Sequence, residues 1–160
     1  MYKGVKMLSN EKVIDLSMYS KENINLHLSI LQEIIKRMAD NSFKIKGWSI
    51  TLVSALLGLL ISNTNVTSND LFILLIPIIG FGFIDAYYLR LERVFRNRYE
   101  SDVKKIREGR IEEVQLLSFS SDNTKSEKTK YIEALLSKSI LLLYIPLILS
   151  VIFIIYILKN

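Results

Sequence analysis

The side chains in this sequence best suited to binding are its basic residues, which concentrate in two segments. One group of arginines follows directly on an apolar run, and a second group of bases precedes another such run. A cationic surface of this kind binds polyanions strongly and in a salt-dependent way, and aromatic side chains among the bases can stack on nucleobases. The candidate ligand contacts are Lys36, Arg37, Lys44, Lys46, Arg90, Arg93, Arg96, Arg98, Lys104 and Lys105, with Phe43, Phe95 and Tyr99 as candidate stacking residues.

A second interpretation gives the same bases no ligand. Basic residues beside an apolar run also contact lipid headgroups. A base four residues from an acid, as Arg96 is from Glu92, can form an ion pair along one helix. The pattern alone leaves both interpretations open.

Residues for covalent or metal chemistry are missing from the sequence. It has no cysteine, which excludes disulfides and thiolate metal sites, and a single histidine, His27, cannot form a zinc centre alone. No glycine-rich phosphate loop and no Ser/His/Asp or Cys/His set is present. The sequence therefore predicts no enzyme, no metal and no cofactor.

The elements that must position the bases are apolar helices. Half of the 160 residues are hydrophobic, and they gather in three blocks at about 47–62, 71–89 and 139–158. A bilayer core of about 30 Å needs ~20 apolar residues in a helix. Trp48 and the Tyr87-Tyr88 pair suit the headgroup boundary. The sequence predicts an all-α membrane protein with three transmembrane helices.

The distribution of positive charge predicts the orientation. Residues 63–70 carry no lysine or arginine, whereas residues 1–46 carry eight and residues 89–138 carry twelve. Under the positive-inside rule both long polar segments and the N terminus lie on the cytoplasmic side of the membrane. The short turn then lies outside, and an odd number of spans places the C terminus in the periplasm.

The first two helices are expected to extend beyond the membrane as a long helical hairpin. Apolar and small residues recur at three- and four-residue steps from Leu28 to Ser49, which gives one helix a stripe for a partner. Leu91, Val94 and Ile106 could pack on that stripe from the second helix, which Gly109 could end or interrupt. The expected division is 1–20 tail, 21–46 cytoplasmic helix, 47–62 first span, 63–70 external turn, 71–89 second span, 90–117 cytoplasmic helix, 118–130 linker and 131–158 helix with the third span.

Small residues in the first span form a separate pattern. Ser54, Gly58 and Ser62 repeat every four residues, a spacing that lets helices approach closely in lipid. We expect this stripe to pack on the second span within the same chain. A pore-lining face is the alternative, because small hydroxylated residues leave room for water and ions.

The second span contains helix-loosening residues and one acid. Pro77, Gly80 and Gly82 invite a bend, for which a static kink is favoured over a gate hinge. Asp85 is costly in an apolar span and needs a partner. We expect a structural ion pair with a base of the same layer, rather than a proton relay or an ion-selecting acid. The candidate partners are Lys44, Lys46 and Arg90.

Two of these segments together resemble a known family. The sequences RMADNSFKIKGW before the first span and FIDAYYLRLERVFRNRY after the second, joined by a short turn, resemble SLATT-like membrane effectors of bacterial antiphage systems. Among them the chain is most similar to the channel subunits of Hailong systems. The resemblance covers about residues 27–107.

This resemblance implies a function and partners. It implies a homo-oligomeric, tetrameric ion channel of the inner membrane, encoded beside a partner nucleotidyltransferase. Its cytoplasmic basic chamber would bind a nucleotide or a short single-stranded oligodeoxynucleotide made by that enzyme. In Hailong systems the bound oligomer holds the channel shut, whereas in most related systems the nucleotide opens the effector. The direction of gating therefore stays open, and only the basic residues named above are carried over as ligand contacts.

Two other functions fit the same sequence. One is a non-conducting membrane scaffold that recruits a cytoplasmic partner through its helical hairpin. The other is a holin-like toxin that permeabilises the membrane without any ligand.

Overall fold

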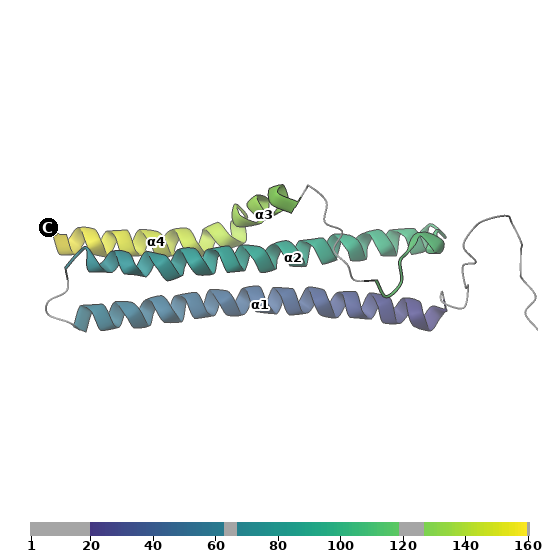
Figure 1. Cartoon of the computed structure of the whole chain (residues 1–160), viewed down its shortest axis with the longest axis horizontal. Helices are drawn as coiled ribbons and strands as arrows, with labels where there is room; N and C mark the ends of the chain where they lie inside the picture. The colour runs from purple at the N-terminus through teal and green to yellow at the C-terminus, as the bar shows by residue number, and fades with distance from the viewer. Residues whose placement is uncertain (1–19, 63–66, 119–126, 160) are drawn as a thin grey trace, which may run out of the picture.

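The computed structural model describes residues 20–62, 67–118 and 127–159 of the chain (Figure 1). Every regular element in these ranges is helical. The prediction of an all-α chain with three helices long and apolar enough to cross a membrane is confirmed. The expected N-terminal tail, most of the linker and half of the expected external turn lie outside the described residues.

The first arm of the hairpin is α1 (Lys21–Ser62), a single helix of 42 residues. The Ser20 hydroxyl accepts a hydrogen bond from the Asn23 amide at 3.2 Å, and Glu22 lies in the first turn at the positive end of the helix dipole. At 1.5 Å per residue this helix is about 63 Å long, roughly twice the thickness of a hydrocarbon core. A membrane could therefore hold only one half of α1.

The second arm begins with a short 3₁₀ turn, η2 (Asp70–Leu74), and continues as α2 (Leu75–Arg107), a helix of 33 residues. Pro77 lies in the first turn of α2, where a proline without an N–H group is well tolerated. Gly80 and Gly82 lie further along in the same continuous helix. The helix therefore continues past Pro77, Gly80 and Gly82 to Arg107 without an interruption.

The end of α2 corrects one prediction, because the expected helix 90–117 ends ten residues early. Gly109 takes a positive φ of 74°, a backbone conformation that glycine adopts without a steric penalty. The amide of Gly109 donates to the carbonyl of Ile106 at 3.2 Å, and the amide of Arg110 donates to that of Lys105 at 2.9 Å. These two bonds form a Schellman motif, which closes the helix.

Beyond this stop the chain folds back along the hairpin. A short 3₁₀ turn, η3 (Ile111–Glu113), opens a segment of residues 111–117 that we call the strap. Two side chains of the strap, Val114 and Leu116, are buried at 1% and 5% exposure, and so anchor it to the helices. The strap ends at Leu117, a non-glycine residue with a positive φ of 56°.

The last helical stretch is also interrupted. The sequence predicted one helix over 131–158, whereas the structure has α3 (Glu127–Leu135) and then α4 (Lys138–Lys159). The Ser137 carbonyl accepts the first α4 hydrogen bonds, at 3.1 and 3.0 Å, so a new helix starts there. Pro146 lies inside α4.

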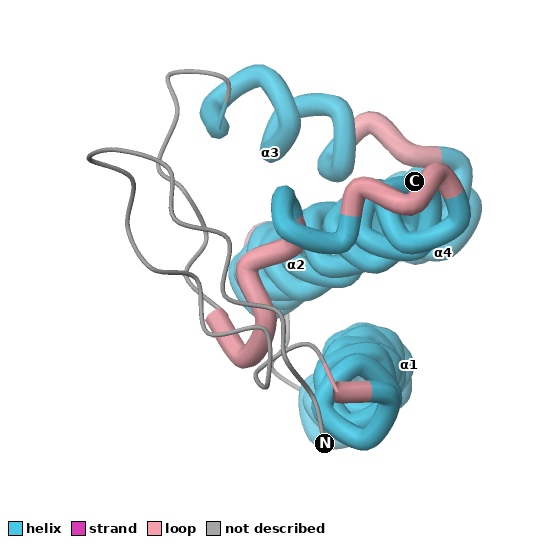
Figure 2. The backbone as a smooth tube through the Cα atoms, turned by 90° about the vertical axis from the view of Figure 1, so that its right-hand side faces the viewer, coloured by secondary structure: helices cyan, strands magenta, loops and turns pink. Residues whose placement is uncertain are grey.

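The three long helices lie in a row with α2 in the middle (Figures 1 and 2). α1 packs along one side of α2, while α3 and α4 lie against its other side. The shared core consists of Val53, Leu71, Leu74, Ile78, Ala86, Ile140, Tyr144 and Val151.

A single row of helices leaves most of its apolar surface uncovered. Only 17% of the most apolar window of α1 is buried, with 33% for α2 and 17% for α4. Soluble monomers rarely expose apolar patches of this extent. The described helices thus lack the burial expected of a soluble monomer, which fits their being covered by lipid or by further copies.

The small-residue stripe of α1 corrects a second prediction. Ser54, Gly58 and Ser62 are exposed, and a Cβ atom added at Gly58 would meet nothing within 4 Å. α2 instead packs against the opposite face of α1, where Ser49 and Val53 are buried. The prediction that the stripe packs on the second span is therefore wrong. The alternative of a pore-lining face stays a prediction.

Candidate functional site

The first candidate site is a polar cluster at the junction between the charged and the apolar halves of α1 and α2. Asp85 of α2 is fully buried. The Lys46 ammonium of α1 lies 2.6 and 2.7 Å from its two carboxylate oxygens, and the Ser42 hydroxyl donates to the same carboxylate at 2.5 Å. The predicted structural ion pair of Asp85 is confirmed, with Lys46 as the partner among the three candidates.

The third long helix reaches this cluster through Tyr144. Its hydroxyl group is buried and faces Asp85 and Ser49 without an aligned hydrogen bond to either. Its ring packs on Gly82, where an added Cβ would lie 3.8 Å from the ring carbons. We call Ser42, Lys46, Ser49, Asp85 and Tyr144 the polar layer, because they join α1, α2 and α4 at one level.

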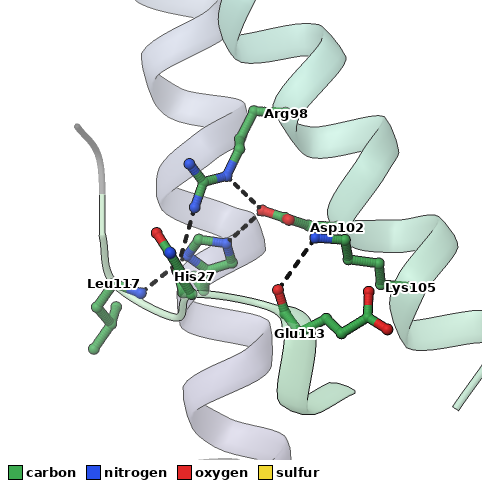
Figure 3. Close-up of polar contacts among 7 residues, drawn as sticks. His27, Arg98, Asp102, Lys105, Glu113 and Leu117 are labelled. Carbon is green, nitrogen blue, oxygen red and sulfur yellow. Dashed lines mark hydrogen bonds and ion pairs between the residues drawn. The ribbon is translucent and has the colours of Figure 1, made fainter. Parts of the chain in front are cut away.

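A second cluster lies near the other end of the hairpin (Figure 3). His27 of α1 is fully buried, and its Nε2 lies 3.1 Å from a carboxylate oxygen of Asp102 on α2. Arg98 Nε donates to the same oxygen at 3.1 Å. The buried carboxylate thus receives two donors, one from each arm.

The His27 ring also holds the strap. The amide of Leu117 donates to His27 Nδ1 at 3.2 Å, so Nδ1 is an acceptor and the ring proton must sit on Nε2, where it can bond Asp102. The histidine is therefore a neutral bridge between Asp102 and the end of the strap. Such a bridge fixes both the tautomer and the ring orientation.

Two bases of α2 contact the strap through its backbone. The Lys105 ammonium donates to the Glu113 carbonyl at 3.1 Å, and Arg98 Nη2 reaches the Gln115 carbonyl at 3.5 Å. Figure 3 shows the Arg98 and Lys105 side chains leaving α2 toward this segment. Between α2 and the strap lies a cavity of about 210 Å³, which is lined by Arg98, Ser101, Asp102, Lys105, Glu113 and Gln115.

The predicted ligand contacts do not form one surface in a single chain. Lys36, Arg37 and Lys44 are exposed on α1 at positions turned away from α2. Lys46 is engaged in the polar layer, and Arg96 pairs with Glu92 along α2, as the second interpretation expected.

The remaining predicted bases lie on α2. Arg93 Nη1 reaches the Glu133 carbonyl of α3 at 3.5 Å, and Lys104 is exposed. Arg90 is half-buried, while Arg98 and Lys105 face the strap. The bases therefore divide into an α1 set, a set beside α3 and a set beneath the strap.

The aromatic candidates also differ from one another. Phe43 is 77% exposed and is free to stack. The Tyr99 hydroxyl accepts a hydrogen bond from Gln32 at 2.9 Å, which ties it to α1, and Phe95 is half-buried. Only Phe43 among the three presents an open face in this chain.

Sequence reasoning missed the second cluster. His27 and Asp102 lie 75 positions apart, and neither belongs to a motif. A signal was present, since His27 precedes Leu31 by one helical turn on the same stripe that buries Met38 and Ser42. A polar residue on such a stripe needs a polar partner from the facing helix.

Comparison of the chain with protein-family models, curated proteins and solved structures gives no match.

Proposed function

We propose that this protein is an oligomeric ion channel of the bacterial inner membrane, gated by a nucleotide or short single-stranded DNA bound to its basic helical arms. Opening would depolarise the cell, as expected of an effector that aborts phage infection. The partner enzyme would be the nucleotidyltransferase implied by the family resemblance.

The observation that carries the proposal is the outward face of the apolar half of α1. Gly47, Thr51, Ser54, Gly58 and Ser62 share this face, since they recur at steps of three and four residues and are all exposed. Hydroxyls on it bond within the helix, Thr51 to the Gly47 carbonyl at 3.0 Å and Ser62 to the Gly58 carbonyl at 2.6 Å. Their oxygens keep lone pairs for water or cations, so this face suits a wet pore better than lipid.

Several copies are needed to build such a pore. One chain presents a single row of helices, so its outward α1 face can enclose a channel only when other copies complete the ring. The family resemblance favours a tetramer. The large exposed apolar surfaces of α1, α2 and α4 are then shared between lipid and neighbouring subunits.

A ligand on the arms can act on the pore because the helices are continuous. α1 runs without a break from its charged half, with Lys36, Arg37 and Lys44, into its apolar half. A ligand that binds one state of the arms better than the other shifts the pore between states. A preference of about 5.5 kcal/mol moves the population from 1:99 to 99:1.

The experiment is a conductance measurement in planar bilayers, with and without a short oligodeoxynucleotide. We expect a conductance that the oligonucleotide changes, and that Gly58→Leu reduces by filling the pore face. The matched control is Gly80→Leu on α2, since both glycines face open space in the chain. No conductance in either condition would refute the proposal, and equal effects of the two leucines would remove α1 from the pore.

The same measurement separates the other functions. A scaffold would co-purify with a partner and conduct nothing. A holin-like toxin would conduct and kill without responding to the oligonucleotide. Reversing the charge at Arg93 and Arg96 should abolish ligand control of a gated channel but leave a toxin lethal.

A further inference from the structure

The cavity between α2 and the strap has the features of a phosphate site. Its volume is about 210 Å³, and a water molecule takes up roughly 30 Å³ of liquid, so it has room for a phosphate group and part of a sugar. Arg98, Ser101 and Lys105 follow one another at steps of three and four residues, which places them on one face of α2. Two cations and a hydroxyl therefore converge on one space.

The cations of this cavity now meet only weak or neutral acceptors on the strap. Lys105 bonds the carbonyl of Glu113, and the Arg98 contact to the carbonyl of Gln115 is long, at 3.5 Å. A phosphate oxygen carries negative charge, so it adds an ion-pair attraction to these two cations that a neutral carbonyl oxygen does not supply. A phosphate can thus take the places that the two carbonyl oxygens hold.

The acids that line the cavity do not repel an anion at full strength, because each is already paired. Asp102 accepts from His27 and from Arg98. The Glu113 carboxylate accepts two bonds from Arg110, at 3.2 and 3.0 Å. Hydrogen bonds from Arg110 also hold the pKa of Glu108 below its ordinary value, so this end of α2 stays ion-paired at neutral pH.

Lipid headgroups cannot be the source of this phosphate. Lys105 lies sixteen residues beyond Leu89, the end of the apolar part of α2, which is about 24 Å along a helix. The site therefore takes a phosphate from solution, either inorganic phosphate or the phosphate of a nucleotide.

We propose that Arg98, Ser101 and Lys105 form a phosphate-binding site beneath the strap, and that phosphate binding exchanges the strap carbonyls for phosphate oxygens. The proposal rests on the function proposed above insofar as the natural ligand is a nucleotide or oligonucleotide. It adds that the ligand is held by a phosphate group within one protomer. It also adds that binding loosens the strap, which then remains held by its buried side chains and by the Leu117 bond to His27.

The test uses the full-length protein in detergent at low ionic strength. The probes are inorganic phosphate, a 5′-phosphorylated oligothymidylate and the same oligomer with a 5′-hydroxyl, each titrated by calorimetry. Ser101→Asp places a carboxylate in the cavity and should weaken binding of inorganic phosphate at least tenfold, while Ser101→Asn has the same shape and should bind nearly as wild type. Lys105→Gln should weaken binding about tenfold, and Arg107→Gln, which removes a nearby exposed charge, should not.

The outcomes are distinct. Tighter binding of the 5′-phosphorylated oligomer than of inorganic phosphate assigns the site to a nucleotide, and equal binding assigns it to free phosphate. Equal binding of phosphate to Ser101→Asp and Ser101→Asn, or equal losses at Lys105 and Arg107, would overturn the site. If the site is overturned but the oligonucleotide still gates the conductance, with or without its 5′-phosphate, the phosphate site is refuted and the channel proposal is not. Phosphate binding as expected in a protein that never conducts would leave the site standing and the channel refuted.

Discussion

The Asp85→Asn substitution tests the role of the polar layer most directly. The amide keeps the shape of the side chain and removes its charge, which leaves Lys46 against a neutral group with its side chain only 19% exposed. Breaking a buried ion pair by removing one partner costs roughly 3–5 kcal/mol. Because Lys46 can turn its ammonium toward water at the edge of the layer, we expect the lower end, about 3 kcal/mol of unfolding free energy.

The assay is reversible unfolding of the purified protein in mixed micelles, followed by circular dichroism. Asp40→Asn is the matched control, since Asp40 is an exposed acid on α1 and its loss should change stability by less than about 0.5 kcal/mol. The double variant Asp85→Leu/Lys46→Met removes both charges and should recover to within about 1 kcal/mol of wild type. The reasoning fails if Asp85→Asn is no worse than the control, or if the double variant is as unstable as the single one.

Three further substitutions test other parts of the fold. His27→Leu should speed amide exchange at Leu117 and cost about 2 kcal/mol, because it leaves a buried carboxylate with one donor fewer, and unchanged exchange would remove the bridge. Gly109→Ala should lower the free energy of unfolding by about 1 kcal/mol, because Gly109 has a positive φ. Its control, Gly47→Ala on an open helical face, should raise the free energy of unfolding by up to about 1 kcal/mol. Melting temperatures that shift in the same direction for both variants would contradict Gly109 as the helix stop. Tyr144→Phe should change the unfolding free energy by less than about 1 kcal/mol, since its hydroxyl has no aligned bond to lose, and a larger loss would show that the hydroxyl does bond Asp85.

Features that follow from local chemistry could be predicted from the sequence. α1 is continuous because its stripe keeps its period from Leu31 to Val53 and no proline interrupts it. The partner of Asp85 could be narrowed to three bases because a charge at that depth must be compensated by one within reach. The choice of Lys46 over Lys44 then follows from its side of the helix, four residues after Ser42.

Features that depend on which neighbour is present could not be predicted in this way. The spacing of Ser54, Gly58 and Ser62 permits close packing but does not specify the partner helix. In the structure α2 packs on the opposite face of α1. No glycine or proline lies at the break between α3 and α4 near Ser137, so the sequence does not indicate it. The strap cavity depends on a chain reversal after Gly109, and one glycine signals a helix end without specifying where the following residues pack.

The two polar clusters suggest how binding at the arms could reach the membrane. Among the described residues, the buried acids are Asp85 and Asp102, both on α2, and each bonds a residue of α1. Asp102 follows Asp85 by seventeen positions, which is about 25 Å along the helix. Two fixed points on the same pair of helices oppose sliding of one arm along the other and so favour movement of the hairpin as a unit.

If the protein is the channel proposed above, a ligand at the strap can bias its pore only if the ligand's contacts differ between two positions of that unit, because equal affinity for both states shifts nothing. The strap supplies such a difference. When its carbonyls hold Arg98 and Lys105, these bases are unavailable to a phosphate, and when the strap loosens they are available. If strap position and hairpin tilt are linked through the His27 bridge, then His27→Leu should uncouple phosphate binding from conductance, and it should weaken that binding only modestly, because Asp102 keeps Arg98 as a donor. Ser101→Asp should instead weaken phosphate binding itself at least tenfold.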